Sequence, residues 1–324
     1  MNSPQNVKVN CNCRHAWYAS WRMGALIPLL AVYAVSAVAF ALDPPPTGGY
    51  PNEVTALGED ALFSQSTGGL EATALGYQAL YNNTTGSQNT AVGVFSLYSN
   101  STGGSNVAVG SNALYGNTTG TYNVGIGLNA LVANTTGGGN VAIGYTALQA
   151  HTNGFDNVAI GFGAMSLGTT GDSNTAVGHS AMAFATGIQN TGLGDSALNS
   201  ATGNFNVAVG RAAGLSLAGD ENIVIGHYAG QNLTTGSNNI EIGNQGVARD
   251  TNVIRLGDPT TQRKTFIAGI SRTAVAGGVA VMITNQGQLG VATSSARYKE
   301  NIQPMAESSE AILSLKPVTF RYKS

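Results

Sequence analysis

Charged side chains are scarce in this sequence. Asp, Glu, Lys and Arg make up 9% of its 324 residues, and the formal net charge is −2, whereas about a quarter of an average globular chain is charged. Between residues 42 and 243 there are eleven acidic residues and a single basic one, Arg211. Binding to a phosphate backbone depends on clustered Lys and Arg, so this composition argues against nucleic-acid binding through that stretch.

Cysteine is nearly absent as well. Cys11 and Cys13 are the only two, and both precede an apolar run over residues 23–42. A chain cut after this run has no thiol, which excludes a disulfide framework in the mature protein.

The N-terminus has the pattern of an export signal. Lys8, Arg14 and Arg22 precede the uncharged run, which ends in the small residues Ala39 and Ala41 around Phe40. This predicts a signal peptide over residues 1–41, cleaved after Ala41, and a secreted or cell-surface protein. The alternative is a membrane anchor through residues 23–42, because about 20 apolar residues can span a bilayer.

A repeat dominates the rest of the sequence. After a Pro-rich linker, residues 42–50, a unit close to N-V-A-V-G-x-x-A-L-x-x-x-T-T-G recurs over residues 51–245. Its first Gly returns every 16 to 18 residues, at Gly58, Gly76, Gly93, Gly110, Gly127, Gly144, Gly161, Gly178, Gly194, Gly210, Gly226 and Gly243. A short fixed period indicates a solenoid whose units stack on their neighbours. Val and Ile alternate with Ala before this Gly, which is typical of a strand.

These features predict an all-β solenoid of about twelve flat coils, each with two short strands and two turns. We expect Val, Ile and Leu to point inward, and Gly86, Gly103, Gly120, Gly137 and Gly171 to supply positive φ at the Thr-Gly turns. The Ala stripe is then expected to face another chain in a trimer. The alternative is a monomeric solenoid whose narrow interior is filled by Ala.

The N-V-A-V-G-x-x-A-L unit resembles the YadA-like head repeat of trimeric autotransporter adhesins. The resemblance covers about residues 55–245 and implies a left-handed parallel β-roll that assembles as a trimer. Members of that family bind diverse surfaces, so it implies adhesion to an unnamed glycan or protein.

Residues 246–293 keep a β pattern without the period and are interpreted as a β connector. Val281, Met282 and Ile283 precede the turn Asn285-Gln286-Gly287 and then Leu289, which predicts a hairpin.

The C-terminal segment, residues 294–324, contains RYKENI and ILSLKPVTFRYK. It resembles the start of the endosialidase-type intramolecular chaperone, a self-cleaving domain at the ends of phage tail spikes and fibres. The residue pattern around Glu310 to Leu315 predicts a short helix, followed by a strand. The resemblance implies assembly into trimers and a dyad in which Lys299 activates Ser294 to cut the Thr293–Ser294 bond. The alternative is that these residues form an ordinary strand-to-helix junction.

Other polar residues have structural explanations. His151, His179 and His227 are too far apart along the repeat to share a metal ion, so we expect solvated corner residues and predict no metal or cofactor. The Asn-x-Thr/Ser sequons are interpreted as by-products of the turn sequence; they begin at Asn82, Asn83, Asn100, Asn117, Asn134 and Asn232. The Thr-Thr pairs leave an ice-binding solenoid as a further alternative.

Taken together, the residues and the two resemblances favour an exported, bacterial or phage-derived fibre with a structural or adhesive role. A self-processing serine peptidase and an ice-binding protein are the alternatives. No enzymatic activity apart from autoproteolysis is expected.

Overall fold

The computed structural model describes residues 54–65, 71–168, 171–268 and 277–291. The predicted signal peptide or anchor, the linker over residues 42–50 and the segment 294–324 with its expected helix and strand lie outside the described residues. Within them, no helix is long and apolar enough to cross a membrane.

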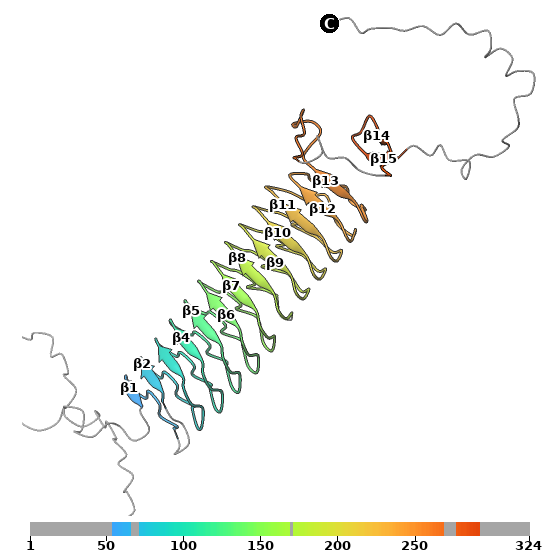
Figure 1. Ribbon diagram of the computed structural model, residues 1–324. Coiled ribbons are helices and arrows are strands. Elements are labelled where there is room, and N and C mark those ends of the chain that lie inside the picture. The colour runs from blue at the N-terminus through green and yellow to red at the C-terminus, as the bar shows by residue number, and fades with distance from the viewer. Residues whose placement is uncertain (1–53, 66–70, 169–170, 269–276, 292–324) are drawn as a thin grey trace, which may run out of the picture. The chain divides into compact units, whose positions relative to one another are not determined.

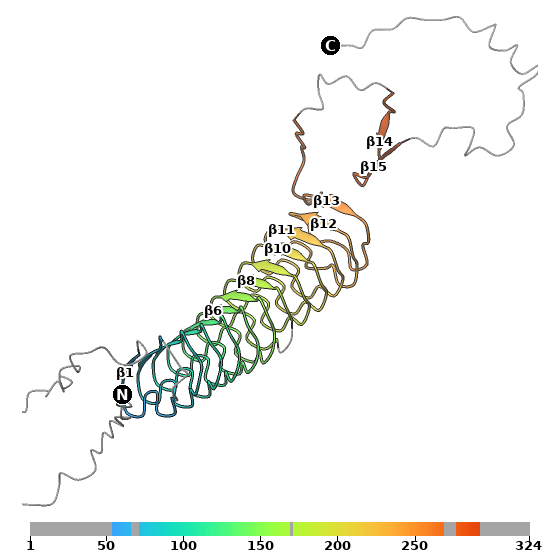
Figure 2. The ribbon, with the colours of Figure 1, turned by 60° about the horizontal axis from the view of Figure 1, so that its bottom comes forward.

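Thirteen strands of three residues each form one parallel sheet in sequence order (Figures 1 and 2). They are β1 (Thr55–Leu57), β2 (Thr73–Leu75), β3 (Thr90–Val92), β4 (Val107–Val109), β5 (Val124–Ile126), β6 (Val141–Ile143), β7 (Val158–Ile160), β8 (Thr175–Val177), β9 (Thr191–Leu193), β10 (Val207–Val209), β11 (Ile223–Ile225), β12 (Ile240–Ile242) and β13 (Ile254–Leu256). Each strand pairs in register with the equivalent residues of the next, so the predicted all-β parallel solenoid is confirmed.

The stack includes part of the segment that we assigned to the connector. β13 pairs in parallel with β12, and it begins 14 residues after β12 (254 − 240), a shorter spacing than in the preceding coils. The described part of the sheet therefore continues past residue 245.

The interior is built from two ladders of unequal size. The central residue of most strands is a fully buried Ala, as at Ala108 and Ala142. Most of the large buried side chains come from the Ala-Leu segment, as at Leu114 and Leu131. The prediction that Val and Ile point inward and Ala outward is therefore wrong. The coil is so thin that only a small residue fits opposite the Leu ladder: a Cβ added at Gly192 would lie 3.0 Å from Met182 Cγ.

Each described coil contains one strand, where the sequence predicts two. The Ala-Leu segment forms a turn in which Leu114 has a φ of 53° and Leu131 the same value. The Leu114 N–H still donates to the carbonyl of Ala130 in the next coil, at 2.9 Å. Stacking hydrogen bonds thus hold a backbone conformation that a bulky residue rarely adopts.

The glycines of the Thr-Gly turns are needed for space. Gly86, Gly103, Gly120 and Gly137 do not have positive φ, contrary to the prediction, whereas Gly171 does, at 140°. A Cβ on Gly120 would overlap the carbonyl oxygen of Gly137 and the side chain of Asn117. Close approach of successive coils explains why no side chain is present there.

Buried Asn side chains form a second type of stacking contact. Asn106 donates from Nδ2 to the carbonyl of Gly120 at 2.8 Å, and its Oδ1 accepts from the backbone N–H of Asn123 at 3.0 Å. The same arrangement recurs from coil to coil through Asn140 and Asn157. These contacts satisfy backbone groups at the coil corners, which explains why Asn recurs four residues before the repeat Gly.

The predicted hairpin is confirmed. Strands β14 (Val281–Ile283) and β15 (Leu289–Val291) pair antiparallel. Gly287 has a φ of 85° in the turn between them, a conformation that favours Gly.

Candidate functional surfaces

The outer face of the thirteen-stranded sheet is uncharged and apolar. The first and third residues of each strand point away from the core, and all of them are Thr, Val, Ile or Leu. The third residues are half-exposed: Val109, Ile126 and Ile143 each keep 36% of their surface accessible, and Leu193 keeps 46%. An exposed apolar face that continues over thirteen strands is typical of an interaction surface.

The corner that follows the repeat Gly carries a row of exposed aromatic and charged side chains. The rings of Tyr145, Phe162 and His179 stack from coil to coil, with centroids 4.9 and 5.3 Å apart. His179 Nδ1 lies 3.1 Å from Asp195 Oδ2, and Arg211 Nε lies 3.5 Å from Asp195 Oδ1. Exposed ion pairs of this kind contribute little to stability, so the row is available for contacts with other molecules.

A second aromatic row lies on the first coils. Phe63, Tyr81, Tyr98 and Tyr115 stack nearly parallel, with centroids 5.0 to 5.3 Å apart. Phe95 packs edge-on against Tyr98 and Tyr115. The ring faces are used for stacking within the chain, so this surface presents mainly ring edges and hydroxyl groups.

The three His residues differ in environment. His179 and His227 are on the surface, as predicted, but His151 is fully buried, so the expectation of a solvated corner residue is wrong there. His151 Nδ1 lies 3.3 Å from the carbonyl of Gly168, and Nε2 lies 3.1 Å from Asn157 Nδ2. Burial is the main cause that lowers the pKa of His151, which favours the neutral imidazole.

His151 occupies a position that Asn holds in earlier coils. Asn83, Asn100, Asn117 and Asn134 are buried, and each of the last three donates from Nδ2 to the Oδ1 of the preceding Asn. The series ends at Asn134, whose Oδ1 is buried without a hydrogen-bond partner. Burial of these four Asn side chains agrees with a structural role for their sequons, because a buried amide is inaccessible in the folded chain.

The Thr-Thr turns give single rows of exposed Thr. Thr118 is partly buried and its hydroxyl donates to the carbonyl of Thr135 at 2.9 Å, whereas Thr119 is exposed. Thr135 and Thr136 repeat this arrangement. Paired rows of Thr on one plane, which the ice-binding alternative needs, are not formed by these two described turns.

A buried carboxyl group was missed in the sequence analysis. Glu241 is the central residue of β12, where most strands have Ala, and it is fully buried with neither oxygen hydrogen-bonded. Arg255, its register partner in β13, places Nε 3.8 Å from Glu241 Oε1 and 2.7 Å from Asp250 Oδ2. Burial raises the pKa of Glu241 to about 7. The sequence did contain a signal for this group, because Glu241 and Arg255 stand at the repeat position that is usually Ala.

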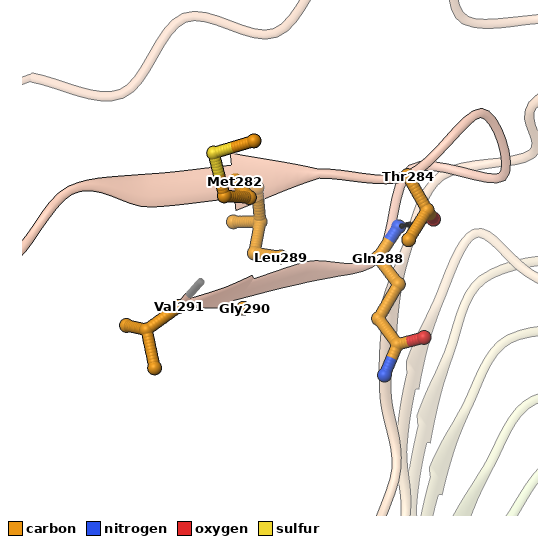
Figure 3. Close-up of a pocket in the computed structure, with 6 residues that line it drawn as sticks. All are labelled: Met282, Thr284, Gln288, Leu289, Gly290 and Val291. Carbon is orange, nitrogen blue, oxygen red and sulfur yellow. Dashed lines mark hydrogen bonds between the residues drawn. The ribbon is translucent and has the colours of Figure 1, made fainter. Parts of the chain in front are cut away.

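The hairpin forms an open pocket lined by Met282, Thr284, Gln288, Leu289, Gly290 and Val291 (Figure 3). These side chains carry no charge, and the part of the chain that the structure describes holds no group of three or more His, Cys, Asp or Glu residues suited to a metal ion. The pocket lining has no acidic or basic side chain that could activate the Thr284 hydroxyl.

The predicted catalytic residues Ser294 and Lys299 lie outside the described residues, so their geometry stays a prediction. Residues 294–324 match the family model described as chaperone of endosialidase. No curated protein and no solved structure shows significant similarity to the chain. The C-terminal match together with the β-solenoid fits a fibre-like structural protein of the phage tail-fibre type.

Proposed function

We propose that this chain is an exported, fibre-like structural protein that works as a homotrimer and contributes to adhesion. The observation that carries the proposal is the apolar outer face of the sheet. It is supported by the match of residues 294–324 to a chaperone family that is associated with trimer assembly. Export is supported by the N-terminal charge and hydropathy pattern alone.

Self-association explains why the outer face has no charge. Large contiguous apolar patches are rare on monomeric soluble proteins and mark contact sites. A flat face of Val, Ile and Thr residues can pack on the equivalent face of another copy, as sheets do face to face. The predicted trimer therefore uses this surface, and the Ala ladder serves the core of each chain.

Native mass spectrometry of residues 42–324 tests the assembly and gives the covalent chain length in the same spectrum. The variant Ile143→Lys places a charge on the outer face, and Tyr122→Lys is the matched control on a turn edge, where Tyr122 is 70% exposed. We expect trimers for the unaltered chain and the control, and monomers with unchanged circular dichroism for Ile143→Lys. A monomeric unaltered chain would overturn the proposal.

Adhesion is assigned to the corner that carries Tyr145, Phe162, His179, Asp195 and Arg211. Aromatic residues and Arg are enriched at binding hot spots. A panel of immobilised glycans and surface proteins tests this assignment. Phe162→Ala and Arg211→Ala should each weaken binding to the captured ligand, whereas Tyr122→Ala on another edge should not. Equal binding by all three variants would place the adhesive surface elsewhere.

Autoproteolysis is the second candidate function, and the family match over residues 294–324 favours it. A Lys with a lowered pKa can accept a proton from a nearby hydroxyl and so activate it, the role that we assign to Lys299 toward Ser294. A chain that ends at Thr293, restored to full length by Ser294→Ala, would establish this activity. A full-length unaltered chain would exclude it.

A further inference from the structure

The hairpin of β14 and β15 separates its side chains into two different faces. Val281 is opposite Val291 and Ile283 is opposite Leu289, while Met282 is opposite Gly290. Because successive residues of a strand point to opposite sides, the four branched side chains share one face and Met282 lies on the other. The four are between 57% and 67% exposed.

The turn fixes which residues occupy the apolar face. The Thr284 N–H donates to the Gln288 carbonyl at 3.0 Å, the Gly287 N–H donates to the Thr284 carbonyl at 2.9 Å, and the Gln288 N–H donates to Thr284 Oγ1 at 3.1 Å. A slip of one residue would move the apolar set to the other face, and these hydrogen bonds prevent it. The face is therefore a defined surface.

An isolated two-stranded hairpin is at best marginally stable in water. No described residue covers the four branched side chains, although burial of such side chains is the main source of stability for a sheet of this size. Residues 277–291 contain no charged residue. The face therefore offers no charge to select a polar partner, and it brings no like charges together if copies pack on one another.

The short distance along the chain between the hairpin and the chaperone match favours a second copy of this chain as the partner. β15 ends at Val291, three residues before Ser294, where the chaperone match begins. Three extended residues reach about 10 Å. If the chaperone segments of three chains assemble, their hairpins are held close together, and such tethering raises the effective concentration into the millimolar range.

We propose that the hairpin is a self-docking element: the apolar faces of three copies, each formed by Val281, Ile283, Leu289 and Val291, pack against one another beside the chaperone segment. This inference rests on the proposed trimer. It assigns to the hairpin an interface separate from that of the thirteen-stranded sheet.

Disulfide cross-linking tests the inference in the full chain, because the only native cysteines, Cys11 and Cys13, can be changed to Ser. Ile283→Cys places a thiol on the apolar face, and Met282→Cys is the matched control on the opposite face. Val281→Cys is a second probe on the apolar face, which covers the case in which Ile283→Cys perturbs the hairpin. Covalent dimers are measured by non-reducing gel electrophoresis after mild oxidation.

We expect Ile283→Cys and Val281→Cys to form covalent dimers at least ten times faster than Met282→Cys. At most two of the three chains in a trimer can be joined, because three equivalent thiols make one disulfide. Native mass spectrometry of the same samples separates the two proposals. If all three cysteine variants are trimeric and form covalent dimers at the same rate, the self-docking hairpin is overturned and the proposed trimer stands. A monomeric chain would overturn both.

Discussion

Replacing His151 with Asn tests whether this buried position is adapted to an amide. In the preceding coils Asn117 and Asn134 each donate to the previous Asn, at 2.8 Å, and to a Gly carbonyl three residues later, at 3.1 Å. An Asn at position 151 is expected to donate to Asn134 Oδ1, which has no partner, and to the Gly154 carbonyl.

The expected gain follows from the hydrogen bonds. A net intramolecular hydrogen bond contributes about 1 kcal/mol, and leaving a buried acceptor unsatisfied costs about 1–3 kcal/mol. Against this, the Gly168 carbonyl loses its contact with His151 Nδ1 at 3.3 Å. Asn157 Nδ2 also loses His151 Nε2 as a neighbour but keeps the Gly171 carbonyl at 2.9 Å. His151→Asn should therefore raise the free energy of unfolding by about 1 kcal/mol at pH 7.5.

The gain should grow as the pH falls. Burial lowers the pKa of His151 below its ordinary value of 6.5, against smaller opposing effects of the Gly168 carbonyl, Asp172 and the Gly171 carbonyl. The unfolded chain therefore binds a proton in a range where the folded chain does not. The contribution of His151 to stability is complete above pH 6.5 and is lost below it, by up to about 1.4 kcal/mol per pH unit until the folded pKa is reached.

Urea unfolding followed by circular dichroism at pH 7.5 and 5.5 measures both effects. The control is His179→Asn, since His179 is exposed and pairs with Asp195. Glu241 has the opposite pH dependence, so each variant is compared with the unaltered chain at the same pH. If His151→Asn lowers stability at pH 7.5 and leaves the pH dependence unchanged, the assignment of this position to the Asn ladder is refuted.

Three further substitutions test the core. Burial raises the pKa of Glu241 to about 7, so its stabilising contribution is full below pH 4.5 and is lost as the pH rises. Glu241→Gln should therefore raise the free energy of unfolding by up to about 3 kcal/mol at pH 8 and leave it unchanged at pH 4, as measured by urea unfolding. Ala142→Leu overfills the interior and should lower the free energy of unfolding by about 1–3 kcal/mol; an unchanged melting temperature would contradict the narrow core. Asn123→Ala leaves the Asn140 N–H without a partner and removes one of two amide donors to the Gly137 carbonyl, which keeps Asn134 Nδ2. This change should cost about 1–3 kcal/mol in the same assay.

The repeat period was sufficient to predict the architecture. Units of nearly equal length with Val or Ile around a central Ala or Gly can bury themselves only by stacking in register, and β4, β5 and β6 do so. The short strands and the hairpin turn before Leu289 followed from local residue patterns. These features depend on contacts between neighbouring residues or equivalent positions, which the sequence displays directly.

Which face of each strand is buried could not be predicted from alternation alone. Val109 and Ala108 point to opposite sides in either arrangement, and the usual preference for larger apolar residues in the core favoured the wrong one. The Leu114 ladder fills most of the thin interior, so only Ala or Gly fits across from it. Lack of space also explains why position 120 is Gly: a side chain there would overlap the next coil, and the backbone does not need a positive φ.

Two titratable residues show the difference between a position in the repeat, which the sequence gives, and burial, which depends on the folded structure. His151 falls in register with Asn134, and Glu241 with Ala108, so the sequence contains their positions in the repeat; burial of each side chain follows only once the coils are stacked. The sequence by itself determined that this chain is a parallel solenoid with a hairpin, because the period and the turn residues are local. The tertiary structure decided which residues are buried and which surfaces face outward, because the width of the coil sets how much volume each ladder can fill.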